Sequence, residues 1–428
     1  MAMEMTVSYE SQFNRIYDAR INELRTGIAK SSVEQGRTRV LNSILEVEGL
    51  NGGECVVIGT LYISSDLKSS IFDMVGRRSK DVEKVGRFTY YSRDVRYFLE
   101  DGSGRIELEL RDSGEIYRRH FVVSTGMCVG VVGRQSETGT FIADDLVLPF
   151  SSPRRIPDVP EKNAVNGRIC FASGVLVDAD SCVARMKVII DYLRRGGVKE
   201  YFLIGNFFES RSEVSKNMLA SLGDVVRYTG ANVRLIPNKG DFGARVLPLV
   251  PVHPKLIDAA VECLSNPCRV DMNGKEGLVI TQFIIDDLLK YMPRNIGSIQ
   301  GEGFEYKMHV NESELKRVVR NEKQDLDAQH TLNTIHAMEV LMKAGHICPT
   351  APDTLACAPF CEQDPFVITN RMEYVCCGDA PGFASRRSDS EGSLFFTIPR
   401  FSNQHEVVVL STEDGTLETI RFDQEEFD

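Results

Sequence analysis

Apolar and polar residues follow two different periods along this chain, and the period changes near residues 50 and 167. From Tyr9 to Lys30, apolar and aromatic residues recur every three or four positions, which predicts an amphipathic helix that packs against the rest of the protein. From about Glu54 to Leu148, short apolar runs alternate with polar residues, which is typical of strands. Five strands are predicted there: Cys55 to Ile63, Val95 to Glu100, Arg105 to Leu110, Cys128 to Arg134 and Thr140 to Val147.

A turn at residues 101–104 joins the second of these strands to the third as a hairpin. In the third strand Ile106 and Leu108 alternate with Glu107, so one face of the hairpin is predicted to be buried and the other wet. Five strands with one longer excursion, at residues 64–93, fit the oligonucleotide/oligosaccharide-binding barrel, or OB-fold.

Aromatic residues in this barrel raise the question of nucleic-acid binding. Barrels that bind single strands display aromatic side chains for base stacking among basic residues. The candidates here are Tyr90, Tyr91, Tyr97 and Phe98, and acidic residues surround them. We therefore interpret them as core aromatics in a protein-binding barrel rather than as a stacking platform.

Residues 151–166 contain three prolines and no periodicity, which predicts a linker between two domains. From Gly167 onward strands and helices alternate, and hairpins follow, which predicts an α/β domain with packed sheets. The predicted elements are a strand Arg168 to Val177, a helix Arg185 to Arg195, a strand Glu200 to Ile204, a helix Ser212 to Tyr228, a strand Asn232 to Ile236, a hairpin turning at Asn273-Gly274, a helix around Ile284 to Tyr291, a charged helical stretch Ser313 to Gly345, and strands Phe366 to Cys376, Leu394 to Ile398, Val407 to Leu410 and Thr416 to Phe422. The expected organisation is a helical segment 1–50, a barrel 51–150, a linker 151–166 and an α/β domain 167–428.

Composition restricts the class of protein. With 42% apolar and 26% charged residues, the 428-residue chain has the make-up of a soluble globular protein, and no apolar run approaches the roughly 20 residues that span a bilayer. Residues 1–10 lack the apolar segment of a secretory signal. Eleven cysteines at irregular spacing, without a Cys-x-x-Cys pair, indicate reduced, mostly buried thiols rather than a zinc or iron–sulfur site. A net charge of −11 repels phosphate, so avid unaided DNA binding is not expected.

The most diagnostic part of the chain lies near its C-terminal end. It consists of Cys348-Pro349-Thr350-Ala351-Pro352-Asp353-Thr354-Leu355, then Asp364-Pro365-Phe366, then Cys377-Gly378-Asp379-Ala380-Pro381-Gly382-Phe383. The prolines force an extended backbone, and the predicted strand from Phe366 leads into a Gly-Asp-Ala-Pro turn. This order of motifs resembles the small (second, or B) subunits of eukaryotic DNA polymerase delta.

Two earlier segments carry the same resemblance. Phe13, Tyr17 and Arg20 form an aromatic-x-x-x-Tyr-x-x-Arg arrangement in the predicted helix, and Cys55 to Leu61 is similar to the family's barrel opening. The resemblance covers nearly the whole chain and is weakest from Lys290 to Leu341. It implies an OB-fold barrel followed by a calcineurin-like phosphoesterase fold, in which Asp, His and Asn side chains at strand ends hold two metal ions.

The metal ligands of an active phosphoesterase are missing from the corresponding positions. Those positions read Ala172-Ser173-Gly174 with Asp178 and Asp180 too late, Gly205-Asn206-Phe207-Phe208-Glu209, Pro237-Asn238-Lys239-Gly240-Asp241, and Cys377-Gly378-Asp379-Ala380. Lys239 stands where the resemblance places the catalytic histidine, and a fixed cation there opposes divalent metal binding. The prediction is an inactivated phosphoesterase fold without catalytic, cofactor-binding or metal-binding residues.

The histidines offer no alternative site, because none of the seven forms a ligand pair with a nearby carboxylate. They are His120, His253, His309, His330, His336, His346 and His405, and they are predicted to be structural or surface residues. No phosphate-binding loop, nucleophile elbow or dinucleotide fingerprint occurs.

The resemblance implies a non-catalytic accessory subunit of the nuclear DNA polymerase delta complex, active in DNA replication and repair. Its implied partners are the cysteine-rich C-terminal domain of the catalytic subunit and a third accessory subunit, with DNA contacted at most indirectly or weakly and no membrane. Two alternatives stay open. One is a metal-dependent phosphodiesterase or 3'-5' exonuclease, and the other is a free-standing single-strand binder that uses the barrel.

Overall fold

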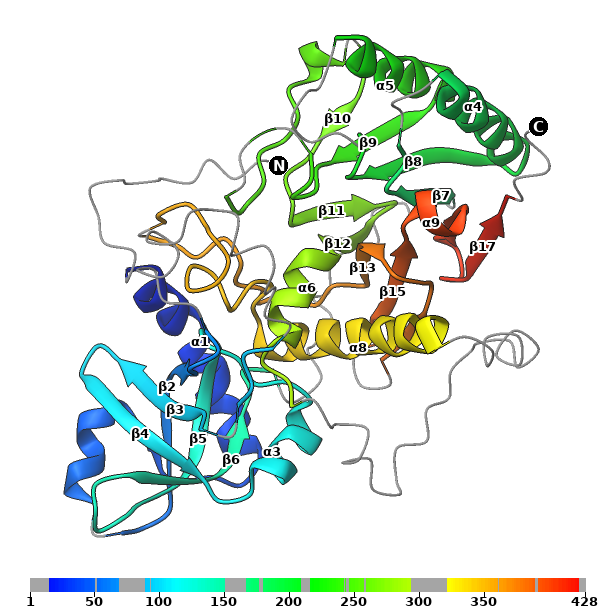
Figure 1. The fold of residues 1–428 in the computed structure, drawn as a ribbon. Helices are drawn as coiled ribbons and strands as arrows, with labels where there is room; N and C mark the ends of the chain where they lie inside the picture. Colours follow the sequence, from blue (N-terminus) through cyan, green and yellow to red (C-terminus); the bar gives the residue numbers. More distant parts are fainter. Residues whose placement is uncertain are drawn as a thin grey trace.

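The computed structural model describes residues 15–50, 52–68, 89–92, 94–150, 167–176, 180–208, 216–241, 243, 246–257, 259–293, 322–360, 362–388 and 392–422. They form a helix, a barrel and a two-sheet α/β sandwich (Figure 1). Several predicted segments lie outside the described residues: 9–14 of the first helix, 69–88 and 93 of the excursion, the linker 151–166, 313–321 of the charged helix, and positions 178, 209, 309 and 361. Across the described parts, no helix is both long and apolar enough to cross a bilayer.

The N-terminal helix α1 (Arg15–Glu34) lies between the barrel and the sandwich. Ile21, Leu24 and Ile28 recur at helical spacing and are buried against Ile58 of the barrel and Val367 of the sandwich. Each such buried side chain stabilises the fold by about 1.5–3 kcal/mol. The predicted packing role of this helix is therefore confirmed.

The barrel contains all five predicted strands, with ends that differ by one residue or less from the prediction. Its elements are β1 (Val40–Leu41), the 3₁₀-helix η1 (Ile44–Gly49), β2 (Cys55–Ser64), β3 (Arg96–Asp101), β4 (Gly104–Leu110), α3 (Ser113–His120), β5 (Cys128–Gln135) and β6 (Phe141–Val147). The strand order β2–β3–β4–β6–β5 closes because β5 also pairs with β2. This closed, five-stranded ring is the OB-fold.

Helix α3 was not predicted, although its start has a readable signal. Asp112 caps the helix, since its side chain accepts a hydrogen bond of 2.9 Å from the backbone N–H of Glu115. Three basic residues end it, which suits the helix dipole.

The barrel aromatics fall into two groups. Tyr97 is buried in the core, and Tyr90 and Tyr91 are partly buried and pack against the same core. Phe98, by contrast, is half-buried on the outer face, where the Arg105 guanidinium carbon lies 3.9 Å from its ring centroid. The interpretation as core aromatics is thus wrong for Phe98, because β3 alternates and turns that side chain away from the core.

The sandwich consists of two sheets whose inner faces pack together, with helices outside each (Figure 1). The first sheet has the order β10–β9–β8–β7–β16–β17 and the second β11–β12–β13–β15–β14. The first sheet is built from β7 (Arg168–Ser173), β8 (Val198–Ile204), β9 (Asn232–Ile236), β10 (Glu262–Cys263), β16 (Glu406–Ser411) and β17 (Leu417–Arg421). The second is built from β11 (Cys268–Met272), β12 (Lys275–Thr281), β13 (Tyr374–Ala380), β14 (Ser385–Arg387) and β15 (Leu394–Pro399).

The helices of the sandwich form its two outer layers. They are α4 (Asp180–Arg195) and α5 (Lys216–Thr229) on the first sheet, α6 (Gln282–Leu289) and α8 (Glu322–Ala344) on the second, and the short η3 (Pro254–Leu256) and α9 (Phe401–Gln404) in connections. One continuous apolar core joins the α6–α8 layer to the barrel, because Val57 and Phe141 belong to the same buried cluster as Met338. The architecture is an OB-fold followed by a metallophosphoesterase-like α/β domain.

The cysteines behave as the alternation of β13 predicts. Cys376 packs between the two sheets, whereas Cys377 belongs to the cluster on the helix side, so the two side chains point apart. Of the nine cysteines that the structure describes, all but Cys263 are buried.

Three strand boundaries of the sandwich differ clearly from the prediction. The first strand of the sandwich, β7, ends at Ser173 instead of Val177. The strand predicted from Phe366 begins only at Tyr374, because the backbone N–H of Phe366 donates to the side chain of Asp364 rather than to a neighbouring strand. At its other end β13 runs through the residues predicted as a turn and stops at Ala380.

Candidate functional site

The carboxyl ends of β7, β8, β9 and β13 bring together residues from all four motif positions of the phosphoesterase pattern. The backbone N–H of Asp379 donates to Ser173 Oγ at 2.7 Å, and Asn238 Nδ2 donates to Asp379 Oδ2 at 2.8 Å. Asp241 in turn accepts the backbone N–H of Asn206 at 2.9 Å. Sequence reasoning therefore identified the right positions for this strand-end cluster.

Asp379 is neutralised by a protein cation. Arg400, which follows β15, donates from Nε to Asp379 Oδ1 at 2.5 Å and from Nη2 to Oδ2 at 2.9 Å. This two-point geometry is the strongest form of an arginine–carboxylate contact. The Asp379 side chain is only 10% exposed, so the guanidinium occupies the open side of the carboxylate. Sequence reasoning did not identify Arg400.

Asp241 is also fully engaged, by backbone groups. Its carboxylate accepts hydrogen bonds from the N–H groups of Asn238 at 2.7 Å, Asn206 at 2.9 Å and Phe207 at 2.9 Å. Burial raises the pKa of Asp241 to about 6, although these three donors oppose the shift. The carboxylate thus fixes two loops to each other.

The loops meet too closely for most side chains. Gly205 has φ of +32°, and a Cβ at this position would lie 2.1 Å from the Cβ of Asn238. The next residue, Asn206, has φ of +54°, in the left-handed region that asparagine tolerates better than most residues. Lys239 is exposed beside this turn, with Nζ 5.7 Å from the ring centroid of Phe283.

These contacts limit what the cluster can do chemically. Every oxygen of the two carboxylates accepts at least one hydrogen bond from the protein itself. Within the described ranges, no three His, Cys, Asp or Glu side chains gather as a metal-binding group. The residues that stand at the four motif positions make hydrogen bonds to one another.

The described histidines lie in different parts of the fold. His120 and His330 each contact one carboxylate, at 3.2 Å from Asp145 and 3.0 Å from Asp286. Burial lowers the pKa of His336 to about 4. The remaining positions are the exposed cap of η3 at His253, the left-handed residue His405 after α9, and the fully buried His346.

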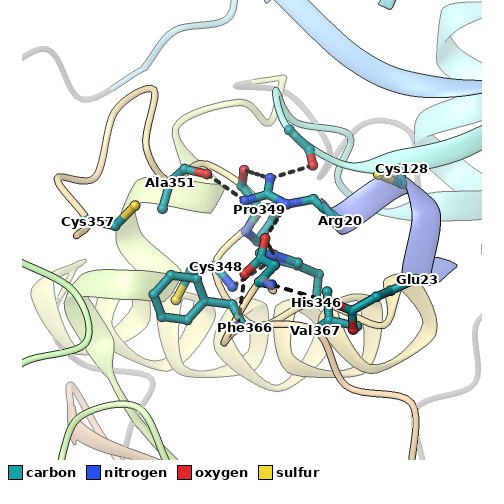
Figure 2. A network of polar contacts seen from close by, with 12 residues as sticks. Arg20, Glu23, Cys128, His346, Cys348, Pro349, Ala351, Cys357, Phe366 and Val367 are labelled. Carbon is teal, nitrogen blue, oxygen red and sulfur yellow. Dashed lines mark hydrogen bonds and ion pairs between the residues drawn. The ribbon is translucent and has the colours of Figure 1, made fainter. Parts of the chain in front are cut away.

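A second polar cluster lies at the junction of α1, the barrel and the sandwich. Figure 2 shows Arg20 extending from α1 toward Pro349 and Ala351 of the Cys348–Leu355 run. The guanidinium donates to the carbonyl oxygens of Pro349 at 2.9 Å and Ala351 at 2.8 Å, and to that of Gly126 in the barrel at 2.9 Å. A fourth bond of 2.7 Å joins its Nε to Asp364 Oδ2.

The pair formed by Arg20 and Asp364 is completely buried, with 0% exposure of both side chains. Burial alone raises the pKa of an aspartate, but Arg20 and His346 hold the pKa of Asp364 well below its usual range. His346 Nε2 lies 2.9 Å from Asp364 Oδ2, while its Nδ1 accepts the backbone N–H of Cys348 at 3.2 Å. The imidazole is therefore neutral, with its proton on Nε2, and burial lowers its pKa to about 4.

The Cys348–Leu355 run lies at this junction and not in the strand-end cluster. Its Asp353 forms an ion pair with Lys68 of the barrel, and its Thr354 hydroxyl donates to Asp287 of α6. The bridging contacts of Arg20 were not predicted, although the sequence contains one signal for its burial. Arg20 lies four residues after Ile16 and four before Leu24, on the apolar face of the helix.

Comparisons with known proteins agree with this architecture. The family model described as "DNA polymerase delta subunit OB-fold domain" matches residues 12–146. The family model for the B subunits of DNA polymerases alpha and epsilon matches residues 169–385, just over half of the chain. Curated small subunits of polymerase delta match over almost their whole length. The chain belongs to the DNA polymerase delta small-subunit family. Members of this family are accessory subunits of the replicative polymerase.

Three relatives illustrate the match to the polymerase delta small subunits. The DNA polymerase delta small subunit of Saccharomyces cerevisiae is 25% identical, and the alignment covers 97% of this chain and 90% of the relative. That of Oryza sativa subsp. japonica is 22% identical, with 96% and 93% covered. DNA polymerase delta subunit 2 of Drosophila melanogaster is 22% identical, with 97% and 94% covered.

Solved structures add little to the family assignment. A dimetal phosphatase from Danio rerio aligns with 60% of this chain and 99% of its own length, at 10% identity and a TM-score of 0.28. A score this low carries no argument about function.

Proposed function

We propose that this chain is a non-catalytic scaffold subunit of a nuclear DNA polymerase delta complex. The proposed partners are the cysteine-rich C-terminal domain of the catalytic subunit and a third accessory subunit. The proposal keeps the boundaries predicted from the sequence, with a helical segment 1–50, a barrel 51–150, a linker 151–166 and an α/β domain 167–428. Membership in the small-subunit family supports it.

The observation that carries the non-catalytic part is the pairing of Asp379 with Arg400. In a dimetal phosphoesterase the charge at this strand end is balanced by two cations that activate water. Here the guanidinium supplies the balancing charge, and Asp241 holds backbone N–H groups. Exposed Lys239 adds a further positive charge beside the cluster.

The buried Arg20 junction supports the scaffold part. A scaffold must present surfaces of two domains in a fixed relation, and here one guanidinium bonds the barrel, α1 and the sandwich at once. The continuous apolar core between the barrel and α8 also holds the two domains together. Partner subunits would therefore meet one rigid body.

The experiment is co-expression of the full chain with a polymerase delta catalytic subunit, followed by size exclusion and mass spectrometry. We expect a stable complex, and we expect it to be lost when the C-terminal domain of the catalytic subunit is deleted. Absence of a complex with the intact catalytic subunit would refute the scaffold proposal.

The non-catalytic part is tested separately with the purified chain, manganese and bis-p-nitrophenyl phosphate. We expect no hydrolysis above the buffer rate. Stoichiometric manganese together with hydrolysis that disappears in Asp241→Asn would revive the exonuclease alternative.

A further inference from the structure

The outermost layer of the sandwich carries an apolar surface that no described element covers. Helices α4 and α5 lie on the side of the first sheet that faces away from the second sheet and from the barrel (Figure 1). One face of α4 is buried against the sheet through Ile189, Ile190 and Leu193. On the opposite face Val188 and Tyr192 lie one turn apart, and each is 56% exposed.

Tyr192 is held in place although it is exposed. Its ring meets the ring of Phe422 edge to face, with centroids 5.9 Å apart and planes at 89°. Phe422 itself is buried in the core of the α4–α5 layer. A partner that packs on Tyr192 would therefore lose little side-chain entropy, which is a property of interface hot spots.

The charge around this apolar pair is positive in a chain whose net charge is −11. Helix α4 contains four basic and two acidic residues, and α5 contains two basic and one acidic residue. Asp191, which precedes Tyr192 in the sequence, is already occupied by the Tyr228 hydroxyl at 2.8 Å and by Arg194 at 3.3 Å. Arg195 and Lys199 are exposed, and neither forms an ion pair within the described part of the chain.

A hollow of about 290 Å³ lies at the carboxyl end of α4, between that end of the helix and the end of α5. Arg194, Val198, Lys199 and residues 229–232 line it. Arg194 is fixed there, because its Nη2 donates to the carbonyl oxygens of Tyr228 and Thr229 at the end of α5. The hollow can therefore accept an acidic side chain beside the ammonium group of Lys199, whereas Arg194 already pairs with Asp191.

We propose that the α4 surface, made of Val188, Tyr192, Arg195, Lys199 and the adjoining hollow, binds an acidic segment of a partner polypeptide. An apolar side chain of that segment packs on Val188 and Tyr192, and its carboxylates pair with Arg195 and Lys199. The two basic residues favour a partner with acidic side chains, and the exposed apolar pair favours a polypeptide with an apolar side chain. A nucleic acid fits less well, because its phosphates have no use for the central apolar contact.

This inference goes beyond the scaffold function, since it requires neither a polymerase subunit nor assembly of the complex. The test uses the full chain and a fluorescein-labelled synthetic peptide in which glutamates alternate with leucine and phenylalanine. A second peptide carries glutamine in place of every glutamate, and labelled oligothymidylate serves as the nucleic-acid probe. Binding is measured by fluorescence anisotropy at low and high salt.

The variants are Val188→Asp and the double charge reversal Arg195→Glu/Lys199→Glu. Leu326→Asp is the matched control, because Leu326 is 70% exposed on α8, outside the α4 surface. We expect the acidic peptide to bind and both variants to weaken it by about tenfold or more, a loss that anisotropy resolves easily. The control should bind like the wild type, high salt should weaken binding, and thermal melts should show that all variants are folded.

Several outcomes would overturn the proposal. It fails if the acidic peptide does not bind, if it binds all variants equally, or if the glutamine peptide binds as tightly. It also fails if oligothymidylate binds and loses affinity through the same substitutions, because the surface would then be a nucleic-acid site.

Discussion

Replacing Arg20 by alanine removes the charge that links α1 to both domains. Arg20 makes four hydrogen bonds, to Asp364 and to the carbonyl oxygens of Gly126, Pro349 and Ala351. Arginine and aspartate are both 0% exposed. Arg20→Ala therefore leaves one buried carboxylate without its cation and three buried carbonyl oxygens without their donor.

The loss can be estimated from these contacts. Leaving one member of a buried ion pair unpaired costs about 3–5 kcal/mol. Each carbonyl that stays dry would add about 1–3 kcal/mol, and water entering the space left by the side chain reduces that part. Because whole domains are stable by only about 5–15 kcal/mol, we expect Arg20→Ala to separate the barrel from the sandwich or to unfold much of the chain.

The assay is urea unfolding of the full chain followed by circular dichroism, with limited proteolysis as a second reading. The double variant Arg20→Met/Asp364→Leu should be less harmful than Arg20→Ala, because no isolated charge stays buried. Arg96→Ala is the control for loss of an arginine–carboxylate contact at the surface, since Arg96 makes a bidentate contact with Glu107 on the exposed face of the barrel. That control should leave the unfolding midpoint unchanged.

Two results would contradict this reasoning. If Arg20→Ala lowers the midpoint no more than Arg96→Ala, the buried pair does not stabilise the junction. If the double variant is less stable than Arg20→Ala, the unpaired charge is not the main cost.

Three further predictions concern the stability of the folded chain. Burial holds the pKa of His346 at about 4, below the ordinary value, so the unfolded chain takes up a proton at a higher pH than the folded chain does. The free energy of unfolding should therefore fall as pH drops from about 6.5 toward 4. His346→Gln should flatten this pH dependence, and an unchanged slope would contradict the assignment. Gly126→Ala should destabilise the chain by about 1–3 kcal/mol in urea, because φ is +83° and the new Cβ would lie 1.8 Å from the Pro349 oxygen. Gly139→Ala, at φ of +89° with open space around it, is the control for backbone strain alone, and equal losses would exclude the contact. Asp241→Asn should cost about 1–3 kcal/mol in thermal melts, because an amide cannot accept from donors on both sides, and a wild-type melting curve would contradict the assigned contacts.

The barrel could be predicted from the sequence because its signals are local. Alternation in β4 and the turn at residues 101–104 specify a hairpin without reference to the rest of the chain. The strand predicted from Phe366 was wrong because the contacts that decide its structure are not local. Its residues have strand-like composition, but their backbone partners are a side chain, Asp364, and distant segments, which no local pattern reveals.

The strand-end cluster shows the same division. Once the motif positions are known, the sequence shows that Ser173, Asn206 and Lys239 stand where an active phosphoesterase has metal ligands. The replacement for the metal charge could not be read, because Arg400 belongs to no motif and meets Asp379 only through the parallel pairing of β13 with β15. The partner of Arg20 could not be read either, since its place on the apolar face of α1 indicates burial but does not reveal Asp364, which lies 344 positions away.

The separation of Arg20 from Asp364 has a consequence for how the protein is made. The two residues are 344 positions apart. At a synthesis rate of about 5–20 residues per second, α1 leaves the ribosome roughly 20–70 s before its carboxylate partner exists. Until then the barrel can form its strands, but α1 cannot bury its guanidinium against a counter-charge. A chain that stops early therefore keeps a charged, half-covered helix at its start, and chaperones and proteases can recognise that helix. The buried pair thus makes docking of the first helix depend on synthesis of the last sixth of the chain.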